Sequence, residues 1–173
     1  MSTPSELERW IAVRQCEGQN VVIVATEDER HALANRFNLV SVDGLRAEID
    51  LSRDGSTVAA KGRLTADIVQ SCAVSGEDLP VTIDERLDLV FVKSEDDSPF
   101  DPDTEIELAE GDLDEIAYGS DRFDLGEAVA QSLGLAIDPY AEGPEAEAIR
   151  RKVDLSEPAK DGPFAALGAL KKN

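Results

Sequence analysis

Two long runs of alternating apolar and polar residues lie in the middle of the chain, between Val58 and Val92. Alternation with a period of two is typical of strands that bury one face. The segment 75–80 between the runs contains a glycine and a proline, which favour a chain reversal. The pattern therefore predicts two antiparallel strands with a shared apolar face. Its apolar members are Leu64, Ala66, Ile68, Cys72 and Val74 on the first strand, and Val81, Ile83, Leu87, Leu89 and Phe91 on the second.

The alternation also predicts a register for these two strands. Pairing Val74 with Val81 brings each apolar residue opposite an apolar partner. This register places Asp67 opposite Asp88, and like charges that face each other directly are unfavourable. A slip of two residues removes that contact but sets polar side chains against apolar ones, so we favour the first register.

Upstream of the two strands, the sequence predicts a strand followed by a smaller helix. The continuous apolar run 21–24 indicates a buried strand. Thr26 followed by Glu29 forms a capping-box pattern, which predicts the first turn of a helix. The apolar patch 7–13 fits either a helix or a strand, and we expect its Trp10 to be a packing anchor.

Further strand is predicted over 39–51, where apolar and polar residues again alternate. The dipeptides Asp43-Gly44 and Asp54-Gly55 are turn signals. Short connections between consecutive strands give antiparallel neighbours, so a meander is expected from residue 39 to residue 92.

The clearest helical pattern covers 124–137, where apolar residues recur at spacings of three and four. Asp124 and Glu127 provide the capping signal at its start. A helix is also expected within 144–152. We therefore expect an α+β fold, with a curled antiparallel β-sheet (a meander, barrel-like) covered by one long amphipathic helix, and with a smaller N-terminal helix and a short C-terminal helix.

We treat residues 1–173 as a single domain with two unusual segments. The first is an acidic excursion over 94–121, which has twelve acidic residues and no Lys or Arg. The second is a polar linker followed by an apolar tail over 153–173. Phe164, Leu167 and Leu170 would share one face of a helix in this tail, which either folds back on its own core or docks into a partner's groove.

The charge composition restricts the class of binding partner. The formal net charge is −20, which opposes binding to a phosphate backbone and favours a basic protein as partner. The acidic excursion, including Glu95, Asp96 and Asp97, is either a solvated segment or a landing surface for such a protein. We also expect no calcium site there, because the loop spacing of calcium ligands is missing.

Candidate catalytic residues are few. The single histidine, His31, is expected either at the surface or as a hydrogen-bonded structural residue, and no nucleophile or metal-ligand pattern surrounds it. Cys16 and Cys72 belong to no CxxC pair, so we expect a free thiol and a small core residue. No catalytic, cofactor or metal site is expected. Nor do we find a leader or a membrane-spanning run, so a cytoplasmic location is the expectation.

Three segments, in this order and spacing, resemble the bacterial YceD family (DUF177), in its proteobacterial branch. They are KGRLTADIVQSCAVSGE at 61–77, DLGEAVAQSL at 124–133 and PFAAL at 163–167. Many members carry a second cysteine where this chain has Ser75, and many carry a C-terminal cysteine cluster that is missing here. A metal-binding role therefore does not carry over.

The resemblance implies a ribosome biogenesis factor that promotes accumulation and processing of large-subunit ribosomal RNA. With the charge, it suggests non-catalytic binding of a basic ribosomal protein or a large-subunit assembly intermediate. One alternative is an acidic, chaperone-like module that shields a basic ribosomal protein. A second is a hydrolase acting on RNA, which would need a pocket holding His31 with two carboxylates.

Overall fold

The computed structural model describes residues 5–94 and 115–152. Its strands form a five-stranded sheet in the order β2-β3-β4-β5-β6 and a separate two-stranded ribbon, β1-β7. In the first sheet the strands are β2 (Asn20–Val24), β3 (Ser41–Asp54), β4 (Thr57–Ser71), β5 (Asp78–Lys93) and β6 (Glu115–Tyr118). The ribbon pairs β1 (Trp10–Ala12) with β7 (Arg122–Asp124). Helices α1 (Glu27–Arg36), α2 (Leu125–Ala136) and α3 (Ala146–Lys152) complete the fold, with a 3-10 turn η1 (Val13–Gln15).

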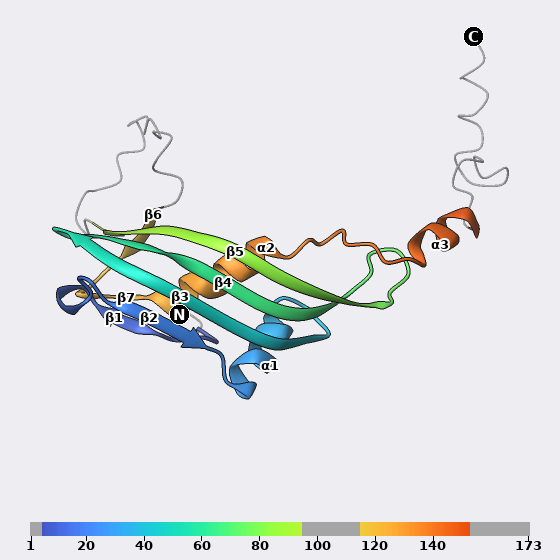
Figure 1. Ribbon diagram of the computed structural model, residues 1–173, viewed down its shortest axis with the longest axis horizontal. Helices are drawn as coiled ribbons and strands as arrows, with labels where there is room; N and C mark the ends of the chain where they lie inside the picture. Colours follow the sequence, from blue (N-terminus) through green and yellow to red (C-terminus); the bar gives the residue numbers. More distant parts are fainter. Residues whose placement is uncertain (1–4, 95–114, 153–173) are drawn as a thin grey trace, which may run out of the picture. The chain divides into compact units, whose positions relative to one another are not determined.

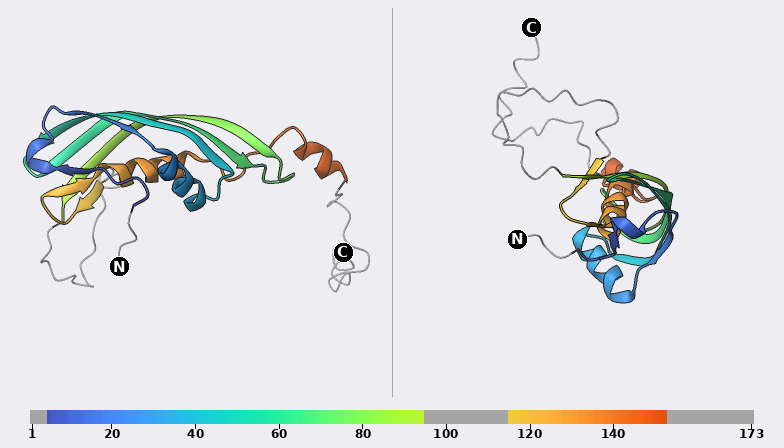
Figure 2. Two further views of the ribbon diagram at one scale, coloured as in Figure 1. Left: turned by 90° about the horizontal axis from the view of Figure 1, so that it is seen from below. Right: turned by 90° about the vertical axis from the view of Figure 1, so that its left-hand side faces the viewer.

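This arrangement confirms the α+β class and corrects two details. The sheet is mostly antiparallel, but β6 pairs with β5 in parallel, with Phe91 opposite Ile116. Within the described residues the sheet is open, with β2 and β6 at its edges, so a closed barrel is not confirmed. Figures 1 and 2 show the long strands curving over α2.

The long strands β4 and β5 are neighbours and bury a common face. Ile68 and Leu87 are 1% and 2% exposed. The predicted pairing of Val74 with Val81 is wrong, because β4 ends at Ser71 and Val74 lies in the turn. The turn lies earlier in the chain than predicted, because the amide of Cys72 already donates to the carbonyl of Glu77 at 2.8 Å.

The shifted pairing removes the expected clash between two carboxylates on the polar face. Asp67 accepts a hydrogen bond from the Thr82 hydroxyl at 2.8 Å. Asp88 pairs with the Lys61 ammonium at 3.2 Å. Because each carboxylate has a partner across the strands, the polar face is compatible with the register.

The predicted turn at Asp43-Gly44 is also wrong. β3 runs through it without a break, and the pairing with β4 shifts between Val42 and Gly44. The dipeptide therefore forms a β-bulge, in which one strand carries an extra residue. The turn at Asp54-Gly55 is confirmed, and Gly55 has a φ of 61°, which glycine adopts without strain.

The two main helices begin where the caps predict. The Thr26 hydroxyl accepts from the amide of Glu29 at 3.4 Å, while the Glu29 carboxylate accepts from the amide of Thr26 at 2.8 Å. Asp124 caps α2. With 12 residues against 10 in α1, α2 is of ordinary length, so the expectation of one long amphipathic helix is not confirmed.

The core lies between the sheet and α2. Leu64 and Ile49 of the sheet are fully buried, as are Leu125, Val129 and Leu133 of the helix. Burying one such side chain stabilises the fold by about 1.5–3 kcal/mol. This packing holds the start of α2 against the sheet, where the pocket described below is formed.

The described residues fall into two compact units. One contains 5–70 and 80–138, and the other contains 71–79 with 139–152. In the second unit the amide of Ala73 donates to the carbonyl of Ala141 at 3.0 Å, and the amide of Glu145 donates to the Glu77 carboxylate at 3.1 Å. Its helix α3 confirms the helix expected within 144–152.

Candidate functional site

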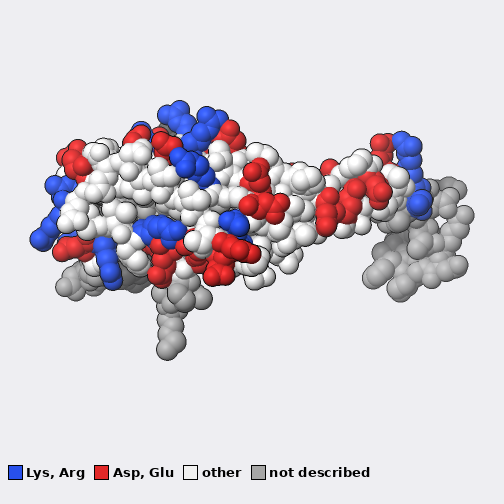
Figure 3. Space-filling view, turned by 60° about the horizontal axis from the view of Figure 1, so that its bottom comes forward, with Lys and Arg blue, Asp and Glu red and all other residues white. Residues whose placement is uncertain are grey.

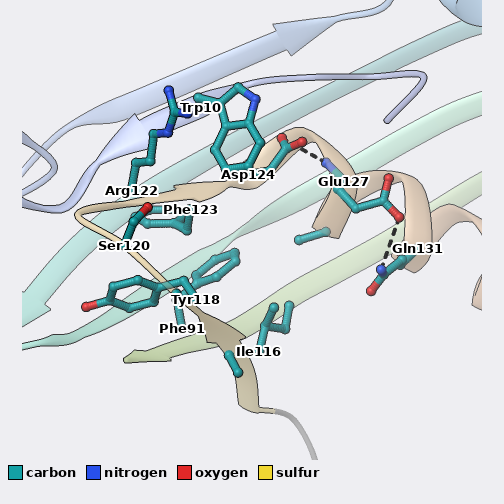
Figure 4. Close-up of a pocket in the computed structure, with 13 residues that line it drawn as sticks. Trp10, Phe91, Ile116, Tyr118, Ser120, Arg122, Phe123, Asp124, Glu127 and Gln131 are labelled. Atoms are coloured by element: carbon teal, nitrogen blue, oxygen red, sulfur yellow. Dashed lines mark hydrogen bonds between the residues drawn. The ribbon is translucent and has the colours of Figure 1, made fainter. Parts of the chain in front are cut away.

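A pocket of about 360 Å³ opens where β1, β6 and β7 meet the first turns of α2. Figure 4 shows the residues that surround it. Asp124 links these elements, because its Oδ1 accepts hydrogen bonds from the amides of Arg9 at 2.9 Å, Gly126 at 3.0 Å and Glu127 at 3.2 Å. One carboxylate thus caps α2 and ties the segment just before β1 to it.

A close contact between backbones fixes the same corner. The amide of Leu125 donates to the carbonyl of Arg9 at 3.0 Å. A Cβ placed at Gly126 would overlap the carbonyl oxygen of Leu7. Only glycine permits this approach, so the first turn of α2, whose Glu127 and Ala128 line the pocket, lies directly against residues 7–9.

Aromatic side chains form much of the pocket wall. Of the eight aromatic residues in the chain, Trp10, Phe91, Tyr118 and Phe123 line this pocket. Phe91 and Phe123 stack with ring centroids 4.2 Å apart. Both are 1% exposed, whereas Trp10 is 51% exposed. Trp10 is therefore not the buried packing anchor that we expected, because its ring lies at the mouth of the pocket.

Cationic and anionic groups meet at the rim. The guanidinium carbon of Arg122 lies 4.8 Å from the centre of the Trp10 ring, a cation–π contact. Asp124 and Glu127 also line the pocket. Glu127 is held by Arg36 of α1, which donates from Nη2 to Oε1 at 2.7 Å. The hydrogen bonds from Arg36 lower the pKa of Glu127 to about 2, so this carboxylate is ionised at neutral pH.

A second unusual group, Cys72, lies in the unit of 71–79 and 139–152. Its sulfur accepts three backbone N–H groups, from Gly143 at 3.3 Å, Ser75 at 3.3 Å and Val74 at 3.5 Å. Led by the bond from Gly143 and joined by one from the Ser75 side chain, these contacts lower the pKa of the Cys72 thiol to about 7. The thiol is buried as expected, but it follows the end of β4 and belongs to the turn.

The remaining sequence-based candidates lie elsewhere. His31 is exposed on α1, as expected. Cys16 is buried and free, and burial raises the pKa of its thiol. The six expected partner contacts, Glu95, Asp96, Asp97, Phe164, Leu167 and Leu170, fall outside the described residues. So do the apolar tail and most of the acidic excursion, of which Ser94 and residues 115–121 are described.

Sequence reasoning missed the pocket. Its aromatic residues are distant in the chain, at positions 10, 91, 118 and 123. A usable signal was present, because Phe91, Tyr118 and Phe123 lie on either side of residues 95–114 in a chain with few aromatics. Among residues 5–94 and 115–152, no three His, Cys, Asp or Glu side chains are grouped as metal ligands. In the same residues, no helix is long and apolar enough to span a membrane.

The chain matches a known protein family. A family model described as "Large ribosomal RNA subunit accumulation protein YceD" matches residues 60–171, which is more than half of the chain. Comparison with curated proteins and with solved structures gives no match. The matched range contains β5, β6, β7 and α2, and therefore most of the pocket wall.

Proposed function

Because the chain belongs to the YceD family of large ribosomal RNA subunit accumulation proteins, we propose that it is a ribosome biogenesis factor that acts by binding a protein and not by catalysis. The family match over residues 60–171 is the observation that carries this proposal. Its site of action would be the cytoplasm, on intermediates of the large subunit. The partner that we propose is a basic ribosomal protein or an assembly intermediate that displays one.

The distribution of charge supports a protein partner. Ten acidic residues and no Lys or Arg fall within 95–114, a number that equals half of the formal net charge of −20. On the face shown in Figure 3, cations and carboxylates are interleaved over the described residues. A phosphate backbone would gain little from such a surface, whereas a basic protein would be attracted by the acidic excess.

A deletion strain tests the role in subunit accumulation. Loss of the gene should lower the ratio of large to small ribosomal subunits in sucrose gradients, and the full chain should restore it. A strain with normal subunit ratios and normal large-subunit ribosomal RNA would contradict the proposal.

Two deletions separate the modes of partner binding. Removing 95–114 tests electrostatic attraction, and removing 163–173 tests docking through the apolar tail. Each variant is used to pull down proteins from large-subunit precursors at physiological salt. If the acidic segment carries the attraction, only the first deletion should reduce recovery of basic ribosomal proteins, and added salt should reduce it in the full chain.

A further inference from the structure

The proposed attraction of a basic partner by the acidic residues does not involve the aromatic pocket beside α2. Four aromatic residues and two carboxylates line it, and one cation of the chain already lies against its Trp10. We propose that this pocket takes an arginine or lysine side chain of the basic partner. The inference rests on the proposed function for the identity of the partner, and it adds the place where that partner is held.

The walls of the pocket suit a cation. The faces of aromatic rings carry negative charge density, so they attract guanidinium and ammonium groups, most strongly when water is excluded. Trp10 and Tyr118 contribute such rings, and the Arg122 guanidinium at 4.8 Å demonstrates that the Trp10 ring accepts a cation. The half-exposed Trp10 leaves part of its surface free for a second molecule.

The charges around the pocket also favour a cation over an anion. Asp124 and Glu127 line the pocket together with one cation, Arg122. Glu127 shares its partner Arg36 with Glu6, so this cluster of three keeps a net negative charge. The methylene stem of a Lys or Arg side chain would pack on Ile116 and on the exposed part of Trp10, while its charged end lies near Asp124.

Arg122 discriminates between a cationic and an anionic occupant of the pocket. It occupies part of the Trp10 surface and repels an incoming cation, so removing it should help a basic ligand. If the pocket instead took an anionic group, Arg122 would be the main attraction, and removing it should abolish binding. The substitution Arg122→Ala therefore has opposite effects for the two kinds of occupant.

The lone tryptophan reports on the site directly. Trp10 is the only tryptophan in the chain, so its fluorescence follows the mouth of the pocket. The probe is an acetylated, amidated octapeptide of alternating alanine and arginine, titrated at physiological salt. A peptide with glutamine in place of arginine is the neutral control. We expect a saturable change with the arginine peptide and none with the glutamine peptide.

Three variants assign the change to the pocket. Ser120 is exposed, lies outside the strands and lines the pocket, so Ser120→Phe and Ser120→Arg should obstruct it without disturbing the core, and each should weaken binding about tenfold. Ser52→Phe, at an exposed position of β3 outside the pocket, should bind as the unmodified chain does. Arg122→Ala should bind at least as tightly. Equal binding by the Ser120 and Ser52 variants, or loss of binding in Arg122→Ala, would overturn the proposal.

The same variants distinguish this inference from the proposed function. In the deletion strain, Ser120→Phe should fail to restore the subunit ratio, while Ser52→Phe should restore it. Full restoration by Ser120→Phe would refute the pocket and leave the role in subunit accumulation standing. A deletion strain with normal subunits would refute that role, whatever the peptide titration shows.

Discussion

Arg36 in the last turn of α1 binds Glu127 in the first turn of α2 through two parallel hydrogen bonds. Nη1 donates to Oε2 at 2.9 Å and Nη2 donates to Oε1 at 2.7 Å, across 91 positions of sequence. Arg36 also contacts the Glu6 carboxylate at 2.7 Å. A planar guanidinium matched to a carboxylate is the strongest geometry for such a pair, so it ties three distant segments together at one wall of the pocket.

Glu127→Gln should make the protein less stable at neutral pH by about 1 kcal/mol, allowing for screening by water. The pKa of Glu127 is lowered from 4.5 to about 2 by its bonds to Arg36. A group with a lowered pKa in the folded state stabilises the fold above its unfolded pKa, and that contribution is lost as the pH falls toward about 2. Urea unfolding from pH 7 down to pH 2 measures it.

The matched control for this pair is Glu147→Gln. Glu147 pairs with Arg151 one turn away in α3, and both side chains are about three-quarters exposed. That substitution should change the free energy of unfolding by less than about 0.5 kcal/mol. Equal effects of the two substitutions would show that the bidentate geometry at Glu127 adds nothing.

Gly126→Ala should destabilise the protein by about 3 kcal/mol or more, because the added methyl group would collide with the Leu7 carbonyl and push α2 away from residues 7–9. Thermal and urea unfolding would detect the loss. Gly119→Ala is the control, since a Cβ there meets only the Ser94 hydroxyl at 3.9 Å. A tolerated Gly126→Ala would mean that α2 starts elsewhere.

The thiol of Cys72 should ionise with a midpoint near pH 7. Hydrogen bonds from the Gly143 amide and from the side chain and amide of Ser75 favour the thiolate, and they lower the pKa from the ordinary value of 9.0 to about 7. The ultraviolet absorbance of the thiolate, followed in Cys16→Ser so that only Cys72 titrates, measures it without requiring access for a reagent. Unfolding in urea should return the midpoint to that of an ordinary cysteine.

The same shift predicts how the local structure around Cys72 responds to pH. Because the folded pKa is lowered, the stabilisation is complete above the unfolded pKa and is lost as the pH falls through about 7. Hydrogen exchange at the amides of Ser75 and Gly143 should therefore show weaker protection at pH 6 than at pH 8, after correction for intrinsic rates. In Cys72→Ser this difference should disappear.

Leu64→Ala should cost about 2–5 kcal/mol, whereas Leu135→Ala should cost less than about 0.5 kcal/mol. Leu64 is fully buried in β4, and Leu135 of α2 is 88% exposed. The two substitutions remove the same atoms, so the difference in the free energy of unfolding isolates burial. Equal costs would place the core on the other face of the sheet.

Local signals in the sequence predicted much of the fold. Alternation identified the buried faces of β4 and β5, because it depends only on the pleat of the strand. Thr26 and Asp124 marked the starts of the two main helices, because a cap is formed by residues within one turn. These features need no knowledge of distant parts of the chain.

Other features depended on distant contacts and were missed. The bulge at Gly44 arises from pairing with β4, and Asp43-Gly44 by itself has the composition of a turn. The register of β4 and β5 was misjudged because a slip by an even number of residues preserves the buried face. The pocket needs Trp10 of β1 to meet Phe123 of β7, and no local pattern specifies that encounter.

The parallel pairing of β6 has a consequence for the acidic segment. Val90 lies opposite Glu115 and Lys93 lies opposite Tyr118, so the chain must return only three positions along β5 and one strand sideways. That distance is roughly 11 Å, which a handful of residues can cover. The twenty residues from 95 to 114 are thus many more than the connection from β5 to β6 requires. The extra length is available to carry acidic side chains. A short glycine–serine bridge in their place should leave the sheet folded while removing ten carboxylates.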